Sequence, residues 1–158
     1  MHDKLYHGAA YYPELWKPED VDADIKLMLD AGINVVRMGE FAWADIEPGP
    51  GKFKIKMFTE VMMRLHSKGI ETIFCTPTAT PPVWLSHGHP ERLFMGVDGI
   101  RMTHGSRQHF CTNNPYFRKR CALVVEAIAE GISGLPGLAG WQIDNELKSH
   151  VSECCCEE

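Results

Sequence analysis

Short β-branched runs alternate along this chain with longer stretches in which apolar residues recur every three or four positions. The short runs predict strands, at residues 5–12, 33–38, 70–75 and 138–143. The helical spacing predicts helices over 18–31, from Phe58 to a stop at Gly69, and over 116–132. Loops remain at 39–52 and 76–115. The resulting alternation of strands and helices predicts a parallel sheet with right-handed crossovers.

Two α/β architectures fit this order, an open doubly wound sheet and part of an eight-fold barrel. No glycine-rich phosphate loop follows the first strand, which disfavours a dinucleotide-binding sheet. Polar residues instead follow the strand ends, at Glu14, Arg37 with Glu40, 76–82 and 144–146. Catalytic residues of a (β/α)8 barrel lie at that rim. We therefore expect a TIM barrel of which these residues supply the first four β/α units, a truncated barrel.

Composition narrows the class of partner. The net charge is -5, whereas nucleic-acid binding requires clustered Lys and Arg, so we expect no nucleic-acid partner. No apolar run approaches the ~20 residues of a membrane span, so we expect no membrane partner. Residues 1–7 are polar and lack the apolar core of a secretory signal, which predicts a cytoplasmic protein.

The strongest chemical motif is Gly-Trp-Gln-Ile-Asp-Asn-Glu at 140–146, where a predicted strand ends. Cleavage of a glycosidic bond needs one carboxylic acid to protonate the leaving oxygen and a second carboxylate to attack the sugar or activate water. The acid works at neutral pH when burial or a nearby negative charge raises its pKa. Glu146 beside the ring of Trp141 is a candidate for that acid, and Asn145 for a hydrogen bond to a sugar hydroxyl. A strand followed by a polar turn explains the same spacing.

Five ordered blocks resemble a known family: GAAYYPE at 8–14, NVVRMGEFAW at 34–43, TPTATPP at 76–82, SRQH at 106–109 and WQIDNE at 141–146. With these the chain resembles glycoside hydrolase family 42, the β-galactosidases built on a (β/α)8 barrel. The resemblance implies that residues 1–158 form the amino-terminal half of a TIM-barrel catalytic domain. It implies retaining hydrolysis of terminal β-D-galactosyl residues from β-galactosides or oligosaccharides. It also implies a homotrimer, because members of the family are often trimers.

The same resemblance assigns roles to single residues. Glu146 matches the proton donor and later general base of the family, and Arg107 and Asn145 match its substrate-binding residues. The family's nucleophile is a Glu on a later barrel strand, to which nothing in this sequence corresponds. Because retaining chemistry needs both carboxyls, we expect the 158-residue chain by itself to be inactive.

The cysteines form a second constellation. Thiolates bind structural Zn²⁺ in tetrahedral sets of four. Some family members carry such a zinc, with one cysteine four residues after the Arg and three shortly after the catalytic Glu. Cys111, Cys154 and Cys156 match that pattern, and the resemblance implies a further cysteine about three residues beyond Cys156. Free cysteines are the alternative. Cys75 and Cys121, on a predicted strand and helix face, are expected to be buried apolar thiols.

Several other interpretations stay open on the sequence alone. The chain fits a non-catalytic zinc-binding or interaction module, or another barrel glycosidase such as a β-glucosidase. Arg37 is expected to hold a carboxylate, with Glu40, Glu14 and Glu146 as candidates. Two tryptophans in rim loops fit sugar stacking or core packing equally, and the histidines of the long loop are expected to be solvated. These residues are Trp43, Trp84, His87, His89, His104 and His109.

Overall fold

The computed structural model describes residues 4–105, 107–147 and 153–157. Ser106, which belongs to one of the five blocks, lies outside the described residues. Four strands form one parallel sheet in the order β1-β2-β3-β4. They span Gly8–Ala10, Val35–Met38, Glu71–Cys75 and Leu138–Gln142. The predicted parallel order is confirmed, although β1 begins three residues later than expected.

The three long helices connect these strands. They are α1 (Val21–Asp30), α3 (Lys56–Ser67) and α5 (Pro115–Ile132). Pro18 was expected to open the first helix, and it opens a 3-10 turn over Pro18–Asp20 that runs directly into α1. Asn114 caps α5 by accepting the N–H of Phe117 at 3.0 Å, with Pro at the first helical position where no donor is needed. All three predicted helices are therefore present.

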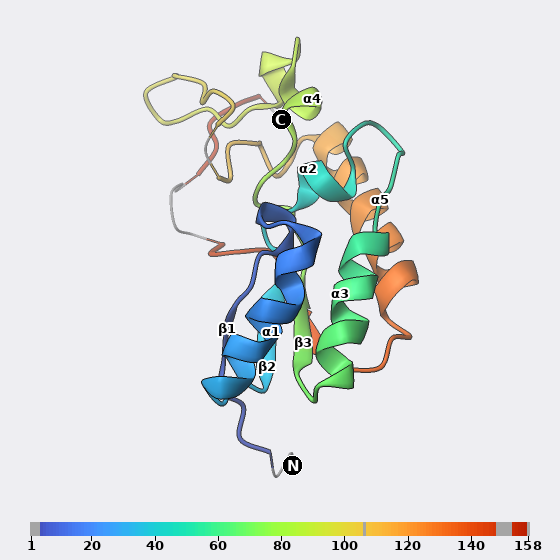
Figure 1. Cartoon of the computed structure of the whole chain (residues 1–158). Helices are drawn as coiled ribbons and strands as arrows, with labels where there is room; N and C mark the ends of the chain where they lie inside the picture. Colours follow the sequence, from blue (N-terminus) through green and yellow to red (C-terminus); the bar gives the residue numbers. More distant parts are fainter. Residues whose placement is uncertain (1–3, 106, 148–152, 158) are drawn as a thin grey trace.

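The two predicted loops contain structure that periodicity could not show. The first contains α2 (Trp43–Ile46), and the second contains α4 (Val83–Ser86) and the 3-10 turn Pro90–Arg92. Two isolated antiparallel bridges, Leu93 with Phe110 and Met95 with Arg101, fold the second loop back on itself. These elements gather at the carboxyl end of the strands (Figure 1). They are only a few residues long, which is too short for a helical repeat to be visible in sequence.

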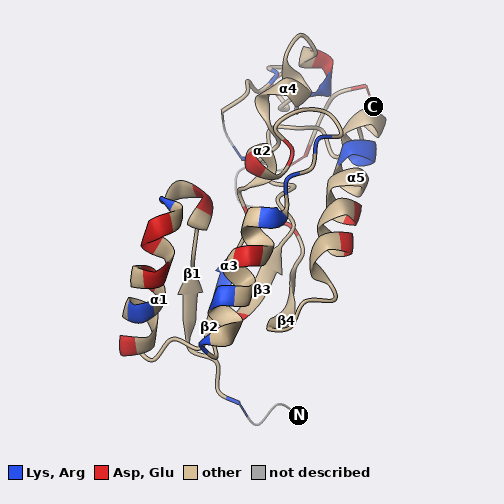
Figure 2. Cartoon of the chain, turned by 45° about the vertical axis from the view of Figure 1, so that its right-hand side comes forward, with Lys and Arg blue, Asp and Glu red and all other residues tan. Residues whose placement is uncertain are grey.

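One continuous core joins the helices to the sheet. Val36, Met38 and Phe74 point to the helix side of their strands, as alternate positions of a strand must. Phe58 packs edge-on against Phe74 with ring centroids 5.6 Å apart. Gly39 follows β2 with φ of 89°, and a Cβ there would come within 2.8 Å of the Phe74 ring. Figure 2 shows that the charged residues lie mainly along the helices and loops, while the strands are mostly uncharged.

A buried carboxylate fastens the first loop to α5. The side chain of Glu47 is fully buried. It accepts the Trp43 indole N–H at 2.9 Å and the Gly51 N–H at 2.7 Å, and it pairs with Arg120. Trp84 donates its indole N–H to the Glu47 carbonyl at 3.0 Å. Trp43 is completely buried, which decides for core packing there, whereas Trp84 is only partly buried against the core and its role stays open.

Replacing Glu47 by Gln in the 158-residue chain should lower the free energy of unfolding by about 3–5 kcal/mol, because Arg120 would keep a buried charge without its counterion. Urea unfolding followed by circular dichroism measures this. Glu60→Gln is the control, since Glu60 forms only an exposed i,i+4 pair with Lys56 and should change stability little. Equal effects of the two substitutions would contradict the role given to Glu47.

Candidate active site

The chain turns sharply where β4 ends. Asp144 and Glu146 both have left-handed backbones, with φ of 58° and 48°, a region that non-glycine residues seldom occupy. The turn is held from the neighbouring strand, because the Asp144 N–H donates to Oγ1 of Thr76 at 2.7 Å. Oδ1 of Asp144 in turn accepts the N–H of Asn145 at 2.8 Å. Asn145 is consequently buried, whereas the side chain of Glu146 is 53% exposed.

Arg107 lies against this strand end. Its Nη1 is 3.0 Å from Oε2 of Glu146. Its guanidinium also lies over the ring of Phe41, 5.5 Å from the centroid, and Phe41 stacks on Tyr12. Tyr12, Phe41, Arg107 and Glu146 follow β1, β2, β3 and β4 respectively. All four strands therefore contribute a side chain to one rim, as the clustering of polar residues after strand ends predicted.

An acid that works at neutral pH was expected to be buried at Glu146, but the described residues leave its side chain 53% exposed. Trp141 was expected beside it as an apolar wall. Its ring packs edge-on to Phe74 on the helix side, 6.2 Å between centroids, and is itself 37% exposed. The reason is the alternation of a strand, which turns Trp141 away from the face that carries Gln142.

A hydrogen-bond network on that other face leads to Asn145. Arg37 holds Glu40 with Nη2 3.0 Å and 2.8 Å from its two oxygens, and Tyr12 donates its hydroxyl to Glu40. Nη1 of Arg37 donates to Oε1 of Gln142 at 2.8 Å, and Nε2 of Gln142 reaches Oδ1 of Asn145 at 3.4 Å. Burial and the Glu40 hydrogen bond raise the pKa of Tyr12. The expected structural role of Arg37 is confirmed, and Glu40 is its partner.

Glu14 is the remaining carboxyl of interest on this rim. Burial, with smaller contributions from the charges of Asp45 and Glu40, raises the pKa of Glu14. One of its oxygens is buried and has no hydrogen-bond partner among the described residues. Glu40 and Glu47 have partners of their own. The sequence predicts that the nucleophile lies outside this chain. That prediction, which excludes Glu14, Glu40 and Glu47 from the role, is not tested by these contacts.

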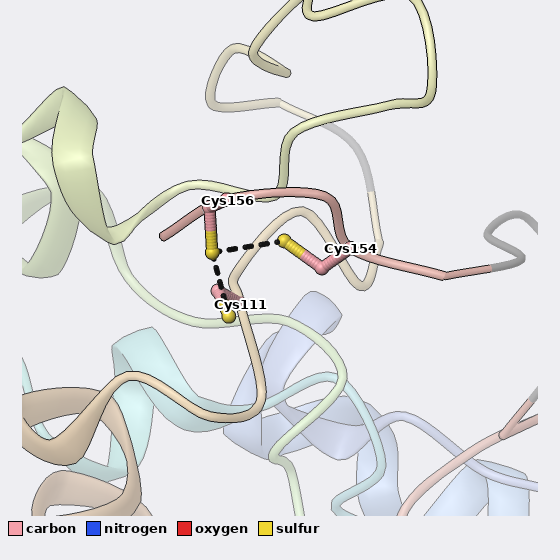
Figure 3. A group of neighbouring side chains, drawn as sticks. All are labelled: Cys111, Cys154 and Cys156. Carbon is pink, nitrogen blue, oxygen red and sulfur yellow. Dashed lines mark hydrogen bonds between the residues drawn. The ribbon is translucent and has the colours of Figure 1, made fainter. Parts of the chain in front are cut away.

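The structure brings the three predicted zinc ligands together. Figure 3 shows Cys111 from the long loop facing Cys154 and Cys156 from the later segment. Sγ of Cys156 is 3.3 Å from Sγ of Cys154 and 3.4 Å from Sγ of Cys111, and all three sulfurs lie within 4.8 Å of one another. Sulfurs bound tetrahedrally at about 2.3 Å from zinc are about 3.8 Å apart. The three thiols thus fit a zinc ion with little movement.

The surroundings of these sulfurs shift the pKa values of two of the thiols in opposite directions. Burial raises the pKa of Cys111 to about 11. For Cys154 burial acts in the same direction, but hydrogen bonds from the N–H groups of Met95 and Cys156, together with those to the thiols of Cys156 and Cys111, outweigh it and lower that pKa. The Cys155 N–H donates to the Met95 carbonyl at 2.8 Å, which anchors the segment 153–157 on the long loop. A bound cation would deprotonate the thiols and add to that anchor.

The histidines do not form a comparable group. Within the described ranges, the only cluster of three or more His, Cys, Asp or Glu with ligand atoms this close is the cysteine cluster. His87, His89 and His104 are exposed, as expected. His109 is buried, which corrects the prediction of a solvated side chain. His109 is buried because the long loop folds back over it. Its Nε2 lies 3.2 Å from Nδ1 of His104, and that Nδ1 also contacts Oγ of Ser86 at 3.1 Å.

A cavity of about 600 Å³ lies beside the strand end, between it and α5. Its lining includes Gln108, Asp144, Leu147, Phe110 and Phe117. Glu146, Arg107 and Asn145 are not among its lining residues. The carboxyl of Glu146 therefore lies outside this cavity, half exposed and paired with Arg107.

Comparisons with known proteins agree with the motifs. The model of the family Glyco_hydro_42, described as Beta-galactosidase, matches residues 10–158. The chain belongs to glycoside hydrolase family 42. It is 58% identical to Beta-galactosidase YesZ from Bacillus subtilis over 154 residues and 57% identical to its counterpart from Bacillus licheniformis over 157. These alignments cover 98% and 99% of this chain.

Solved structures give the same result for the fold. A β-galactosidase from the Antarctic haloarchaeon Halorubrum lacusprofundi superposes with a TM-score of 0.91 at 38% identity, over 96% of this chain and 23% of that one. The family 42 chain thus has the expected α/β fold, a segment of a TIM barrel. It spans only 23% and 24% of the two Bacillus relatives.

Three contacts of this family 42 rim were not anticipated from sequence. Thr76 holds the turn after β4, Gln142 links Arg37 to Asn145, and Gln108 contacts the main chain of Glu146. Gln108 belongs to the SRQH block at 106–109, but the sequence did not predict a role for it. Its left-handed backbone (φ 56°) has no signal in the sequence, because glutamine has no preference for that region.

Alkylation should separate the cysteines by environment. Cys155 is exposed, whereas burial raises the pKa values of Cys75 and Cys121 to about 12. Because the thiolate is the reactive form, iodoacetamide at pH 8 should modify Cys155 at least about a hundredfold faster than Cys75 or Cys121. Peptide mass spectrometry measures the rates, and in urea the three should converge. Rapid native labelling of Cys75 would contradict its burial.

Proposed function

We propose that this chain supplies the proton donor and part of the sugar site of a retaining β-galactosidase, which releases terminal β-D-galactosyl residues from β-galactosides. One observation carries the proposal: the Arg107–Glu146 ion pair at the carboxyl end of β4, beside a buried Asn145. That end of a barrel is where catalytic residues lie. Residues 1–158 are proposed as the amino-terminal half of the catalytic domain, so that the rest of the barrel comes from outside them.

Glu146 is proposed to act twice. As an acid it gives a proton to the glycosidic oxygen while a second carboxylate, about 5–5.5 Å away, attacks the anomeric carbon. As a carboxylate it then takes a proton from the water that releases the galactose. The second carboxylate comes from outside this chain. Later barrel strands would also provide the enclosure that Glu146 lacks among the described residues.

Arg107 and Asn145 are proposed as substrate-binding residues. The guanidinium of Arg107 is a planar, always charged donor group, whose Nη1 lies 3.0 Å from Oε2 of Glu146 and whose Cζ lies 5.5 Å from the centroid of the Phe41 ring. It would orient the carboxyl and bind a sugar hydroxyl at once. Asn145 is buried next to the acid and offers an amide to a neighbouring hydroxyl.

Cys111, Cys154 and Cys156 are proposed as three ligands of a structural Zn²⁺, with a fourth ligand from outside the chain. The ion would cross-link the loop that carries Arg107 to the segment after Glu146, and it takes no part in the reaction. Support comes from the sulfur separations of 3.3 and 3.4 Å. A non-catalytic zinc-binding module would have this cluster too, but it gives no reason for the rim around Glu146.

A different glycosidase, such as a β-glucosidase, would share the acid and the rim. The names of the Bacillus and Halorubrum relatives favour galactosides. Within the described residues no helix has the length and apolar character needed to cross a membrane. The cytoplasmic location, the homotrimer and the absence of a nucleic-acid partner stay predictions.

The test uses a full-length enzyme whose first 158 residues are this chain. It should hydrolyse p-nitrophenyl β-D-galactoside faster than the β-D-glucoside, and Glu146→Gln should lower kcat by about 10²–10⁴-fold on lactose, as loss of a general acid does. Glu91→Gln, which changes an exposed carboxylate of the long loop after β3, is the control. The 158-residue chain alone should give no turnover. Preference for glucosides, or full activity without Glu146, would refute the proposal.

Metal analysis of the same enzyme should find one zinc per chain. Cys111→Ser should remove most of it, because zinc prefers a complete thiolate set, whereas Cys155→Ser should retain it, since Cys155 is exposed and outside the cluster. Substituted Co²⁺ should show thiolate-to-metal absorption that Cys111→Ser weakens. Equal zinc content in both variants would remove Cys111 from the ligand set.

A further inference from the structure

The direction of the Glu146 side chain depends on an unusual backbone. Among the described residues, the non-glycine residues with positive φ are Gln108, Asp144 and Glu146. All three lie at the same rim. An L residue rarely adopts this conformation unless its surroundings enforce it. A change of the Glu146 backbone toward an ordinary region would swing its Cα–Cβ bond, and with it the carboxyl.

The amide of Gln108 holds this backbone on both sides. Its Nε2 donates to the carbonyl of Asn145 at 2.8 Å and to the carbonyl of Glu146 at 2.6 Å. These carbonyls belong to the two peptide groups that flank the Cα of Glu146. Fixing both planes fixes φ and ψ between them, since those are the only soft torsions there.

Gln108 is itself held in place. Its N–H donates to the carbonyl of Ala79 at 2.9 Å, within the same long loop. Its amide has only one workable orientation, because a flip would put Oε1 against two carbonyl oxygens. The preceding residue, Arg107, holds the carboxylate of Glu146. Two consecutive residues thus hold the main chain and the side chain of one acid.

We propose that Gln108 is a positioning residue for the acid/base carboxyl: by holding both peptide groups of Glu146, it aims the carboxyl at the glycosidic oxygen. The inference rests on the proposed function of Glu146 and deepens it. Gln108 acts through Glu146, because its side-chain hydrogen bonds are to the main chain on both sides of the Glu146 Cα. Its loss should therefore weaken the reactions in which proton transfer by Glu146 matters and spare the others.

In the full-length enzyme, substrates whose leaving groups differ in acidity distinguish reactions that need a proton from Glu146 from reactions that do not. Dinitrophenolate departs without a proton, whereas the glucose of lactose needs one. Gln108→Met, which keeps the length and removes the donor, should lower kcat/KM for lactose by about ten- to a hundredfold, the size of effect that a small misplacement produces. For 2,4-dinitrophenyl β-D-galactoside it should change kcat/KM by less than about twofold. Added azide, a nucleophile that needs no base, should raise kcat on the dinitrophenyl substrate and form β-galactosyl azide.

Gln108→Glu provides a second, isosteric variant in case Gln108→Met folds poorly. At neutral pH it should show the same dependence on the leaving group, because a carboxylate cannot donate to the two carbonyls. Thermal unfolding and zinc content verify that each variant is folded. An equal loss on both substrates, or no loss on lactose, would overturn the inference.

Glu146→Gln assayed in parallel keeps the two proposals apart. If it shows a strong dependence on the leaving group and the Gln108 variants do not, the positioning role fails while the acid assignment stands. If Glu146→Gln itself lacks that dependence, the proposed function fails, whatever the Gln108 variants do.

Discussion

The rim of this sheet depends on the attachment of the loop after β3 to the turn after β4. Thr76 accepts the N–H of Asp144, Gln108 donates to two carbonyls of the turn, and Arg107 pairs with Glu146. Asp144 and Glu146 both have left-handed backbones, and without these contacts nothing would hold them in that strained conformation. The geometry of Glu146 therefore depends on both the loop after β3 and the turn after β4, and neither segment fixes it alone.

The cysteine cluster lies on the same pair of segments, farther along each. Cys111 follows Arg107 by four residues, and Cys154 and Cys156 follow the turn. The Met95 backbone already anchors the later segment at both its N–H and its carbonyl. A zinc ion here would make a second cross-link in parallel with the hydrogen bonds of Gln108. Metal binding would then act on the same two segments that position Glu146.

The carboxylates near the carboxyl end of this sheet fall into two groups, buried and half exposed. Glu40 and Glu47 are buried and paired with cations, Glu40 with Arg37 and also with the Tyr12 hydroxyl, and Glu47 with Arg120 and also with two N–H donors. They fix the loops after β2. Glu146 differs because it is half exposed and has one ionic partner on a rim that four strands share. A structural carboxylate is surrounded by donors, whereas a reactive one must leave space for a substrate.

The amino-acid sequence by itself determined the order of the elements, the parallel sheet and the candidate acid, because strand and helix periodicities and strand-end motifs are local properties. Ordered blocks pointed to Glu146 and Arg107, and a family cysteine pattern pointed to three cysteines; the structure brings each of these two groups together. The sequence could not determine the short elements α2 and α4, the burial of His109, the orientation of Trp141 or the contacts of Gln108. Those follow from which distant segments meet, and only the tertiary structure brings residue 108 to within hydrogen-bonding distance of residue 146.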